Sequence, residues 1–194
     1  MTAVKFDLQG TNIYLIGMMG AGKSTTGRLL AQHLDYRFFD TDAAIVQAAG
    51  CSISQIFAES GESSFRQLET QTLGQLSAYK RLVVATGGGI VIERMNWSYL
   101  HHGLVVWLDA SPQTLWQRLQ GDAARPLLQA TNPQQKLEEL LLQRTPLYAQ
   151  ADLRIAIEAR EDAETVARRI LNEIPKVLKP ERLAQPPARA EKRS

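Results

Sequence analysis

The sequence predicts an α/β fold of three layers, in which helices cover both faces of a mainly parallel five-stranded sheet. Two observations predict this architecture. Short apolar runs alternate with longer amphipathic ones, as in chains built from strand–helix–strand crossovers. A glycine-rich loop directly follows the first apolar run, at the end of a strand where a parallel sheet binds its ligands.

Five short apolar runs, several of them rich in β-branched residues, predict buried strands. These strands are expected at residues 12–17, 36–40, 81–87, 103–109 and 151–158. Apolar residues at helical spacing predict helices at residues 24–34, 62–79, 93–100, 111–120, 134–144 and 162–174. The helix at 111–120 has the clearest start signal, because Ser111 can cap it and Pro112 fits its first turn.

Length and composition favour a single globular domain outside the membrane. The chain has 194 residues, 44% hydrophobic and 22% charged, which allows one substantial core. No apolar run approaches the roughly 20 residues that cross a bilayer, and the N-terminus lacks the architecture of a signal peptide. Cys51 is the only cysteine, which argues against a disulfide framework or a CxxC metal site. We therefore expect a cytoplasmic protein without a membrane partner, and a monomer by default.

The net charge of +2 is unevenly distributed. Residues 176–194 hold six basic and two acidic residues, so the other 175 residues carry a net charge of −2. This C-terminal segment also has three prolines and almost no apolar periodicity, which predicts a mobile basic tail. It has no aromatic residue to stack on bases, so we expect no nucleic-acid partner.

The segment Gly17–Ser24, GMMGAGKS, matches the pattern G-x-x-x-x-G-K-[ST] in full. Glycines in such a loop let successive backbone N–H groups surround an anion, and the following helix adds its positive end. The predicted strand before the loop and helix after it argue against a chance match. We expect a nucleoside triphosphate site in which the lysine reaches the outer phosphates and the serine binds Mg²⁺. Its residues are Gly20, Ala21, Gly22, Lys23, Ser24 and Thr25.

The stretch FFDTDAAI places Asp40 and Asp42 one residue apart, directly after a predicted strand. One explanation is structural, because aspartate is a favoured N-cap and a helix could open at Ala43. The other is functional. Residues two apart on an extended segment point to the same side, so the two carboxylates could share one cleft.

Four further segments are more specific than folding alone requires. They are GESSFRQLE (61–69), TGGGI (86–90), GDAARPLL (121–128) and LQRTPLY (142–148). Each has an ordinary explanation by itself: an exposed ion pair between Arg66 and Glu69, a loop, a linker, and a charge at a helix end in Arg144. The interpretation changes when they are read together.

The motifs GMMGAGKST, FFDTD, GESSFRQLE, ATGGG, RPLL and RTPLY follow the order and approximate spacing of shikimate kinases. The chain resembles that family from about residue 12 to about residue 172. The resemblance implies a P-loop kinase fold like that of nucleoside monophosphate kinases, in a single domain over residues 1–175. It implies a substrate-binding segment at about 40–79 and a lid at about 121–133, followed by the tail at 176–194.

The resemblance also implies the reaction and the residues that bind its acceptor. The γ-phosphoryl group of ATP passes to the 3-hydroxyl of shikimate, a step of chorismate and aromatic amino-acid biosynthesis. Asp42 contacts the substrate hydroxyls and is the expected base. Arg66 and Arg144 bind the substrate carboxylate, as forked donors suit a planar carboxylate. The triple glycine, Gly87, Gly88 and Gly89, offers backbone to the substrate.

For the nucleotide side, the resemblance implies that Asp40 and Ser24 lie beside Mg²⁺. Lys23 and the lid residue Arg125 reach the phosphates of ATP. Arg118 and Arg160 are further candidates for nucleotide contacts, the second as the nearest match after the last predicted strand.

Two other classes of function stay open at this stage. A gluconate kinase would share the P-loop but have a different acceptor site, and the Asp-Thr-Asp, Phe-Arg and triple-glycine segments favour shikimate. A catalytically silent binding module on the same fold would be expected to lose Lys23, Asp42 or the arginines, which this sequence retains. A third idea is that the tail recruits a partner or nucleic acid.

Overall fold

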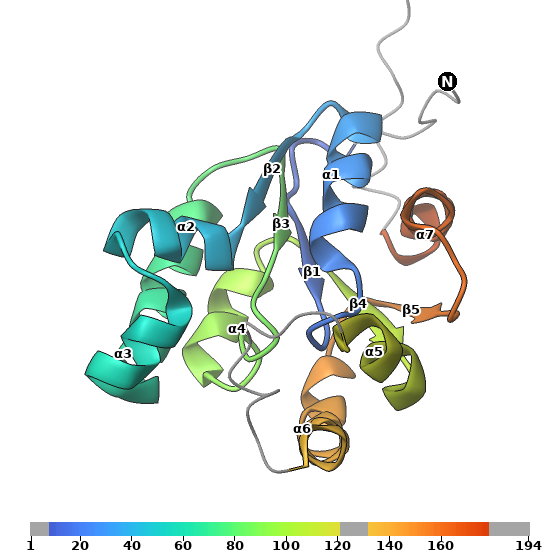
Figure 1. The fold of residues 1–194 in the computed structure, drawn as a ribbon. Helices are drawn as coiled ribbons and strands as arrows, with labels where there is room; N and C mark the ends of the chain where they lie inside the picture. The colour runs from blue at the N-terminus through green and yellow to red at the C-terminus, as the bar shows by residue number, and fades with distance from the viewer. Residues whose placement is uncertain (1–7, 121–131, 179–194) are drawn as a thin grey trace, which may run out of the picture.

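A computed structural model describes residues 8–120 and 132–178 (Figure 1). Its centre is a sheet of five parallel strands in the order β2-β3-β1-β4-β5. The strands are β1 (Ile13–Ile16), β2 (Arg37–Asp40), β3 (Leu82–Ala85), β4 (Leu104–Ala110) and β5 (Leu153–Ile157). The ends of all five strands differ from the predicted ends by at most two residues. The predicted fold class is confirmed.

Seven helices connect and flank the strands within the described ranges. They are α1 (Lys23–Leu34), α2 (Thr41–Ala49), α3 (Ile53–Ser77), α4 (Arg94–Leu100), α5 (Pro112–Leu119), α6 (Pro133–Tyr148) and α7 (Ala163–Val177). None of the helices in this part of the chain is long and apolar enough to span a membrane.

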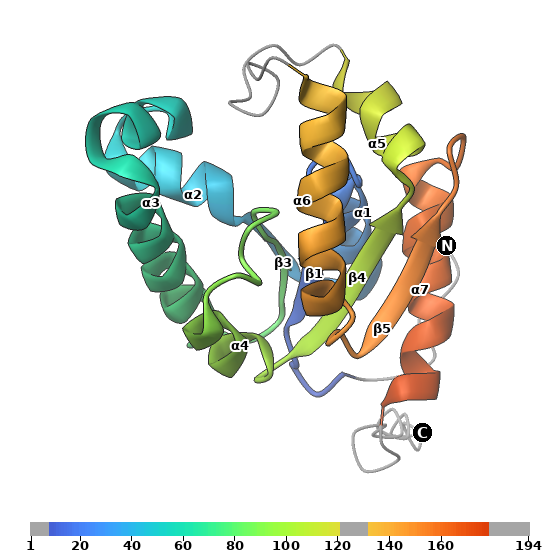
Figure 2. The ribbon, with the colours of Figure 1, turned by 90° about the horizontal axis from the view of Figure 1, so that it is seen from below.

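The helices form a layer on each face of the sheet, as Figure 2 shows from below. On one face, apolar residues of α1, α5 and α7 pack against alternate positions of the strands, among them Leu15 and Val106. On the other face, α3, α4 and the end of α6 pack against positions such as Ile16 and Trp107. A strand alternates its side chains between faces, so a strand covered on both sides is apolar throughout. This explains why all four residues of β1 are buried.

A smaller apolar cluster joins α2 to α3, away from the main sheet. Ile45 of α2 packs there with Ile56 and Phe65 of α3. Between these two α3 residues the helix kinks at Gly61, whose φ of 80° lies in the left-handed region. The cluster therefore holds the α2–α3 unit together beside the carboxyl edge of β2 and β3 (Figure 1).

Helix boundaries were the less accurate part of the sequence prediction. Helix α2 is not among the predicted helices, although a helix opening at Ala43 is one explanation of the aspartate pair, and α3 begins at Ile53 rather than near residue 62. The early start of α3 had a readable signal, because Ser52 and Gln55 form a capping box. Helix α7 extends to Val177, two residues into the segment predicted as a tail; residues 179–194 lie outside the described part.

Helix α6 also continues four residues beyond the predicted end, through Pro146 to Tyr148. A proline in the last turn removes one backbone donor, and that loss alone predicts a helix end. The turn persists because the Tyr148 side chain is fully buried in the core against Trp107. Tertiary packing here overrides the local propensity.

Candidate active site

The glycine-rich loop leaves β1 and closes into the first turn of α1. Gly17, Gly20 and Gly22 all have positive φ, and at Gly17 a Cβ would lie 2.5 Å from the carbonyl oxygen of Leu108. Such a path is open only to glycine. The buried side chain of Lys23 crosses the loop, where its Nζ donates to the carbonyl oxygens of Gly17 at 2.7 Å and Met18 at 2.9 Å.

A cavity of about 480 Å³ opens in front of this loop. Residues 19–26 form one wall of it, and Asp40, Asp42 and Gly88 belong to another part of its lining. Lys23 and Asp42 therefore line one common cavity. Lys23 follows β1 and Asp42 follows β2, two strands of the same parallel sheet, so the cavity lies at the carboxyl edge of that sheet, as expected for this architecture.

Asp40 satisfies both explanations offered for the aspartate pair. Its Oδ1 caps α2 by accepting from the backbone N–H of Asp42 at 3.0 Å and of Ala43 at 3.3 Å. Its Oδ2 accepts from the Ser24 hydroxyl at 2.5 Å, which ties the end of β2 to the phosphate loop. One carboxylate therefore serves the helix and the cavity together.

The two aspartates do not lie on one extended segment, and that prediction is wrong. Asp42 lies in the first turn of α2, because the cap at Asp40 starts the helix immediately after β2. Both residues still line the same cavity.

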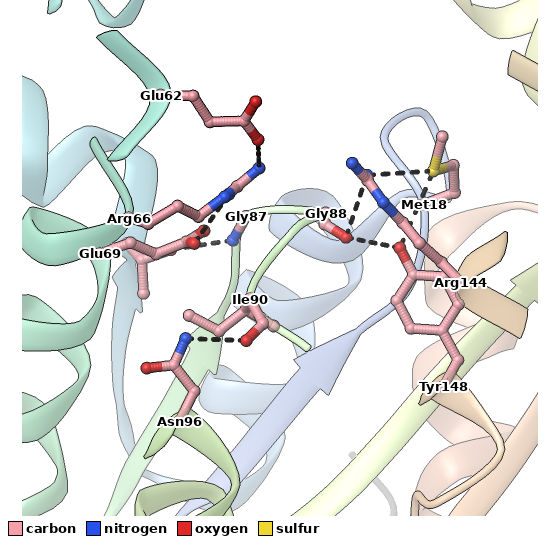
Figure 3. A network of polar contacts seen from close by, with 11 residues as sticks. Met18, Glu62, Arg66, Glu69, Gly87, Gly88, Ile90, Asn96, Arg144 and Tyr148 are labelled. Atoms are coloured by element: carbon pink, nitrogen blue, oxygen red, sulfur yellow. Dashed lines mark hydrogen bonds and ion pairs between the residues drawn. The ribbon is translucent and has the colours of Figure 1, made fainter. Parts of the chain in front are cut away.

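Arg66 projects from α3 between two glutamates, as Figure 3 shows. Its Nη1 donates to Glu69 at 2.9 Å and its Nη2 to Glu62 at 3.0 Å. Although burial lowers the pKa of Arg66, the two carboxylates raise it further than burial lowers it. The guanidinium stays charged, and its plane is held by hydrogen bonds from both sides.

Glu69 was not among the predicted site residues and was named only as a possible ion-pair partner of Arg66. It is fully buried, and its Oε1 has no hydrogen-bond partner in the part of the chain that the structure describes. The pKa of Glu69 is raised to about 6, because burial and the neighbouring charge of Asp42 together raise it more than Arg66 lowers it. A buried carboxylate on a helix gives no sequence signal except its spacing of three from an arginine.

The triple glycine brings bare backbone against these groups. A Cβ on Gly87 would lie 2.6 Å from Glu69 Oε1 and 2.7 Å from Asp42 Oδ1, and a Cβ on Gly89 would collide with the Arg66 guanidinium. The segment therefore has glycines because the charged groups occupy the space of their side chains.

Arg144 reaches the triple glycine from the opposite side, on α6. Its Nη1 donates to the carbonyl oxygen of Gly88 at 3.4 Å. The sequence predicted Arg144 at a helix end, but the residue lies inside α6. The helix dipole therefore does not account for its charge. The structure thus brings Arg66 and Arg144 to the two sides of one glycine segment (Figure 3).

The remaining nucleotide candidates differ in position. Arg118 of α5 lines the cavity, and its Nη1 donates to Gly20 O at 3.4 Å. Arg160 is exposed and is not part of the lining, to which its neighbour Glu161 contributes. Arg125 and most of the predicted lid lie outside the described residues.

A phosphate loop on a parallel sheet, with acidic and arginine side chains clustered at the same edge, is typical of a P-loop kinase of a small molecule. The family model described as "Shikimate kinase" matches residues 19–175 of this chain. The chain belongs to the shikimate kinase family.

Individual relatives agree with this assignment. The shikimate kinase of Trichormus variabilis is 61% identical over 172 residues, which cover 89% of this chain and 95% of the relative. That of Synechococcus sp. (strain JA-3-3Ab) is 56% identical over 181 residues, or 93% of this chain and 94% of the relative. The solved structure of shikimate kinase from Acinetobacter baumannii in complex with shikimate has a TM-score of 0.84 at 42% identity, covering 87% of this chain and 95% of that one.

The rival considered from the sequence shares only the fold. A gluconokinase from Sinorhizobium meliloti 1021 has a TM-score of 0.55 at 16% identity, and the alignment covers 87% of this chain and 93% of that one. Likeness at this level describes the architecture and not the acceptor.

We expect Glu69→Gln to remove part of the pH dependence of stability. Because the pKa of Glu69 is raised to about 6, the folded state holds a proton that the unfolded state has released at the same pH. Its stabilising contribution is complete below the unfolded pKa and is lost as the pH rises through about 6. The free energy of unfolding of the wild type minus that of the variant should fall by about 2 kcal/mol from roughly pH 4 to pH 7.

Chemical denaturation at both pH values measures this difference. Glu59→Gln, which changes an exposed glutamate of the same helix, is the matched control and should leave the pH dependence unchanged. A difference that stays constant between the two pH values contradicts the raised pKa of Glu69.

Proposed function

We propose that this chain transfers the γ-phosphoryl group of ATP to the 3-hydroxyl of shikimate, giving shikimate 3-phosphate and ADP, with the roles assigned below. The observation that carries the proposal is the common cavity, which Lys23 and Asp42 both line. In-line attack requires the nucleotide and the acceptor hydroxyl to meet in one space, and this arrangement provides it.

The acceptor pocket suits a molecule with one carboxylate and neighbouring hydroxyls. Arg66 and Arg144 lie on the two sides of Gly88 and Gly89, so a carboxylate above this segment meets a guanidinium on each side. Forked, permanently charged donors bind a planar carboxylate in two contacts. This supports shikimate over an acceptor that lacks a carboxylate, such as a nucleoside.

Asp42 is the residue that we assign to the attacking hydroxyl. It lines the cavity, and its carboxylate lies close to Gly87 on the acceptor side. A carboxylate there accepts a hydrogen bond from the hydroxyl, orients it and takes its proton late in the transfer. Since the transition state of phosphoryl transfer is loose, orientation and charge stabilisation contribute most of the acceleration.

Ser24 and Asp40 are the residues that would hold Mg²⁺ with the nucleotide. Their hydroxyl and carboxylate oxygens lie 2.5 Å apart beside the phosphate loop. Oxygen ligands of this kind suit Mg²⁺, which usually keeps several waters and takes phosphate oxygens. Within residues 8–120 and 132–178 no cluster of three or more acidic, histidine or cysteine side chains could hold a metal by itself. When bound, the ion neutralises charge on the phosphates.

Four expectations from the sequence stay predictions. They are the contacts of Arg125 and Arg160 with the nucleotide, the mobility of the tail, the monomeric state and the cytoplasmic location.

A panel of acceptors tests the proposed reaction. We expect release of ADP from ATP and Mg²⁺ to require shikimate, and not to respond to gluconate or nucleoside monophosphates. A coupled ADP assay with each acceptor in turn measures this. Release with gluconate but not with shikimate would overturn the proposal.

Arg66→Lys should weaken shikimate binding and spare ATP. A lysine loses the bidentate geometry and the bonds to Glu62 and Glu69, so KM for shikimate should rise by about tenfold or more. KM for ATP should change less than about twofold, because Arg66 is not among the residues that line the common cavity in front of the phosphate loop. Initial rates with each substrate varied in turn give both constants.

The matched control is Arg81→Lys, which alters an exposed arginine paired with Asp35 at the other end of β3. It should change neither KM. Equal losses for both substrates in Arg66→Lys would be inconsistent with the assignment.

Asp42→Asn should keep the fold and remove most of the turnover. The amide has the shape of the carboxylate but accepts no proton, so kcat should fall by about 10²- to 10⁴-fold. Steady-state kinetics and thermal unfolding measure the two effects, with Asp35→Asn at an exposed position as control. A kcat within a few-fold of the wild type would rule out the role of Asp42 as base.

A further inference from the structure

Tyr148 carries a hydroxyl group in a place where packing alone would accept phenylalanine. Its side chain is fully buried in the apolar cluster between the sheet and helices α3 and α4. Its ring stacks on Trp107 with centroids 5.9 Å apart. Burying a hydroxyl costs free energy unless it is hydrogen-bonded. The position of this hydroxyl therefore needs an explanation beyond the core.

The hydroxyl points out of the core toward the triple glycine (Figure 3). It donates to the carbonyl oxygen of Gly88 at 2.5 Å, and Arg144, one helical turn earlier on α6, donates to the same oxygen at 3.4 Å. Burial raises the pKa of Tyr148 to about 12, so the group keeps its proton and remains a donor at neutral pH.

The peptide group that contains this carbonyl also contains the N–H of Gly89. In a trans peptide the two bonds point in opposite directions, so a carbonyl held toward α6 directs the N–H to the other side. None of the backbone hydrogen bonds among the described residues uses the N–H of Gly88 or Gly89. The Gly89 N–H is thus a donor without a backbone acceptor, next to Arg66 in the acceptor pocket.

A hydrogen bond at the carbonyl oxygen also polarises the peptide and makes its N–H a stronger donor. Tyr148 consequently affects the direction of the Gly89 N–H and its strength, although it lies below the pocket.

We propose that Tyr148 is a positioning residue for the acceptor, which aims and polarises the Gly88–Gly89 peptide so that its N–H donates to the substrate carboxylate. The proposal rests on the proposed function for the identity of the acceptor. It differs from a core role, because only the hydroxyl and not the ring is required for binding.

Tyr148→Phe tests the proposal, because it keeps the ring and removes the hydroxyl. We expect KM for shikimate to rise about fivefold, the effect of one hydrogen bond, while KM for ATP and the melting temperature stay close to wild-type values. The matched control is Tyr14→Phe. Tyr14 is buried in the same cluster, but its hydroxyl meets Asn12 instead of the site.

A second measurement, the NMR chemical shift of the Gly89 amide nitrogen, reports on the Gly88–Gly89 peptide group itself and needs no substrate. We expect the amide ¹⁵N resonance of Gly89 to move upfield in Tyr148→Phe and to stay in place in Tyr14→Phe, because the hydrogen bond to the preceding carbonyl is lost only in the first.

The outcomes separate the two proposals. If the wild type turns over shikimate but Tyr148→Phe leaves its KM unchanged, the positioning role is wrong and the proposed function stands. An unchanged Gly89 resonance in Tyr148→Phe also overturns the positioning role. An equal rise of KM for shikimate and KM for ATP, together with a lower melting temperature, overturns it as well, because that result indicates a core role. If the wild type does not turn over shikimate, the proposed function fails, and the role of Tyr148 toward that acceptor fails with it.

Discussion

The parallel pairing of β1 with β3 is the constraint on which the site depends. Leu15 lies opposite Ala85 in this register, and Thr86 donates both its backbone N–H and its hydroxyl to the carbonyl of Leu15. The phosphate loop and the triple glycine therefore leave neighbouring strands at the same edge of the sheet. Two loops that are about 70 positions apart in the chain become two walls of one cavity.

Charge at the acceptor side is held by burial and by close packing. Glu69 contributes a carboxylate to an interior position, which is unfavourable by itself and is offset by its bonded partner Arg66. Glycines at 87 and 89 let the backbone approach these groups where any side chain would collide. These charged groups are thus held in place by the fold itself, and preorganised charge of this kind needs little rearrangement.

The two aspartates show how a helix cap and a cavity lining can share one short segment. Asp40 caps α2 and accepts from Ser24, so the same carboxylate starts the helix and fastens it to the phosphate loop. The cap in turn places Asp42 in the first helical turn, where it lines the cavity. The alternatives considered for this stretch were therefore not exclusive.

The sequence by itself determined the order of strands and helices, the phosphate loop and the family. These depend on local patterns: apolar alternation, glycines at fixed spacing and motifs in order. The starts of α2 and α3 also have local signals, in the cap at Asp40 and in the capping box of Ser52 and Gln55. Tertiary structure decided the continuation of α6 through Pro146 and the burial of Glu69, because each depends on packing against other elements, such as Trp107 for the last turn of α6. Contacts of that kind leave no periodic signal, since burial and hydrogen bonding are settled only when the elements pack.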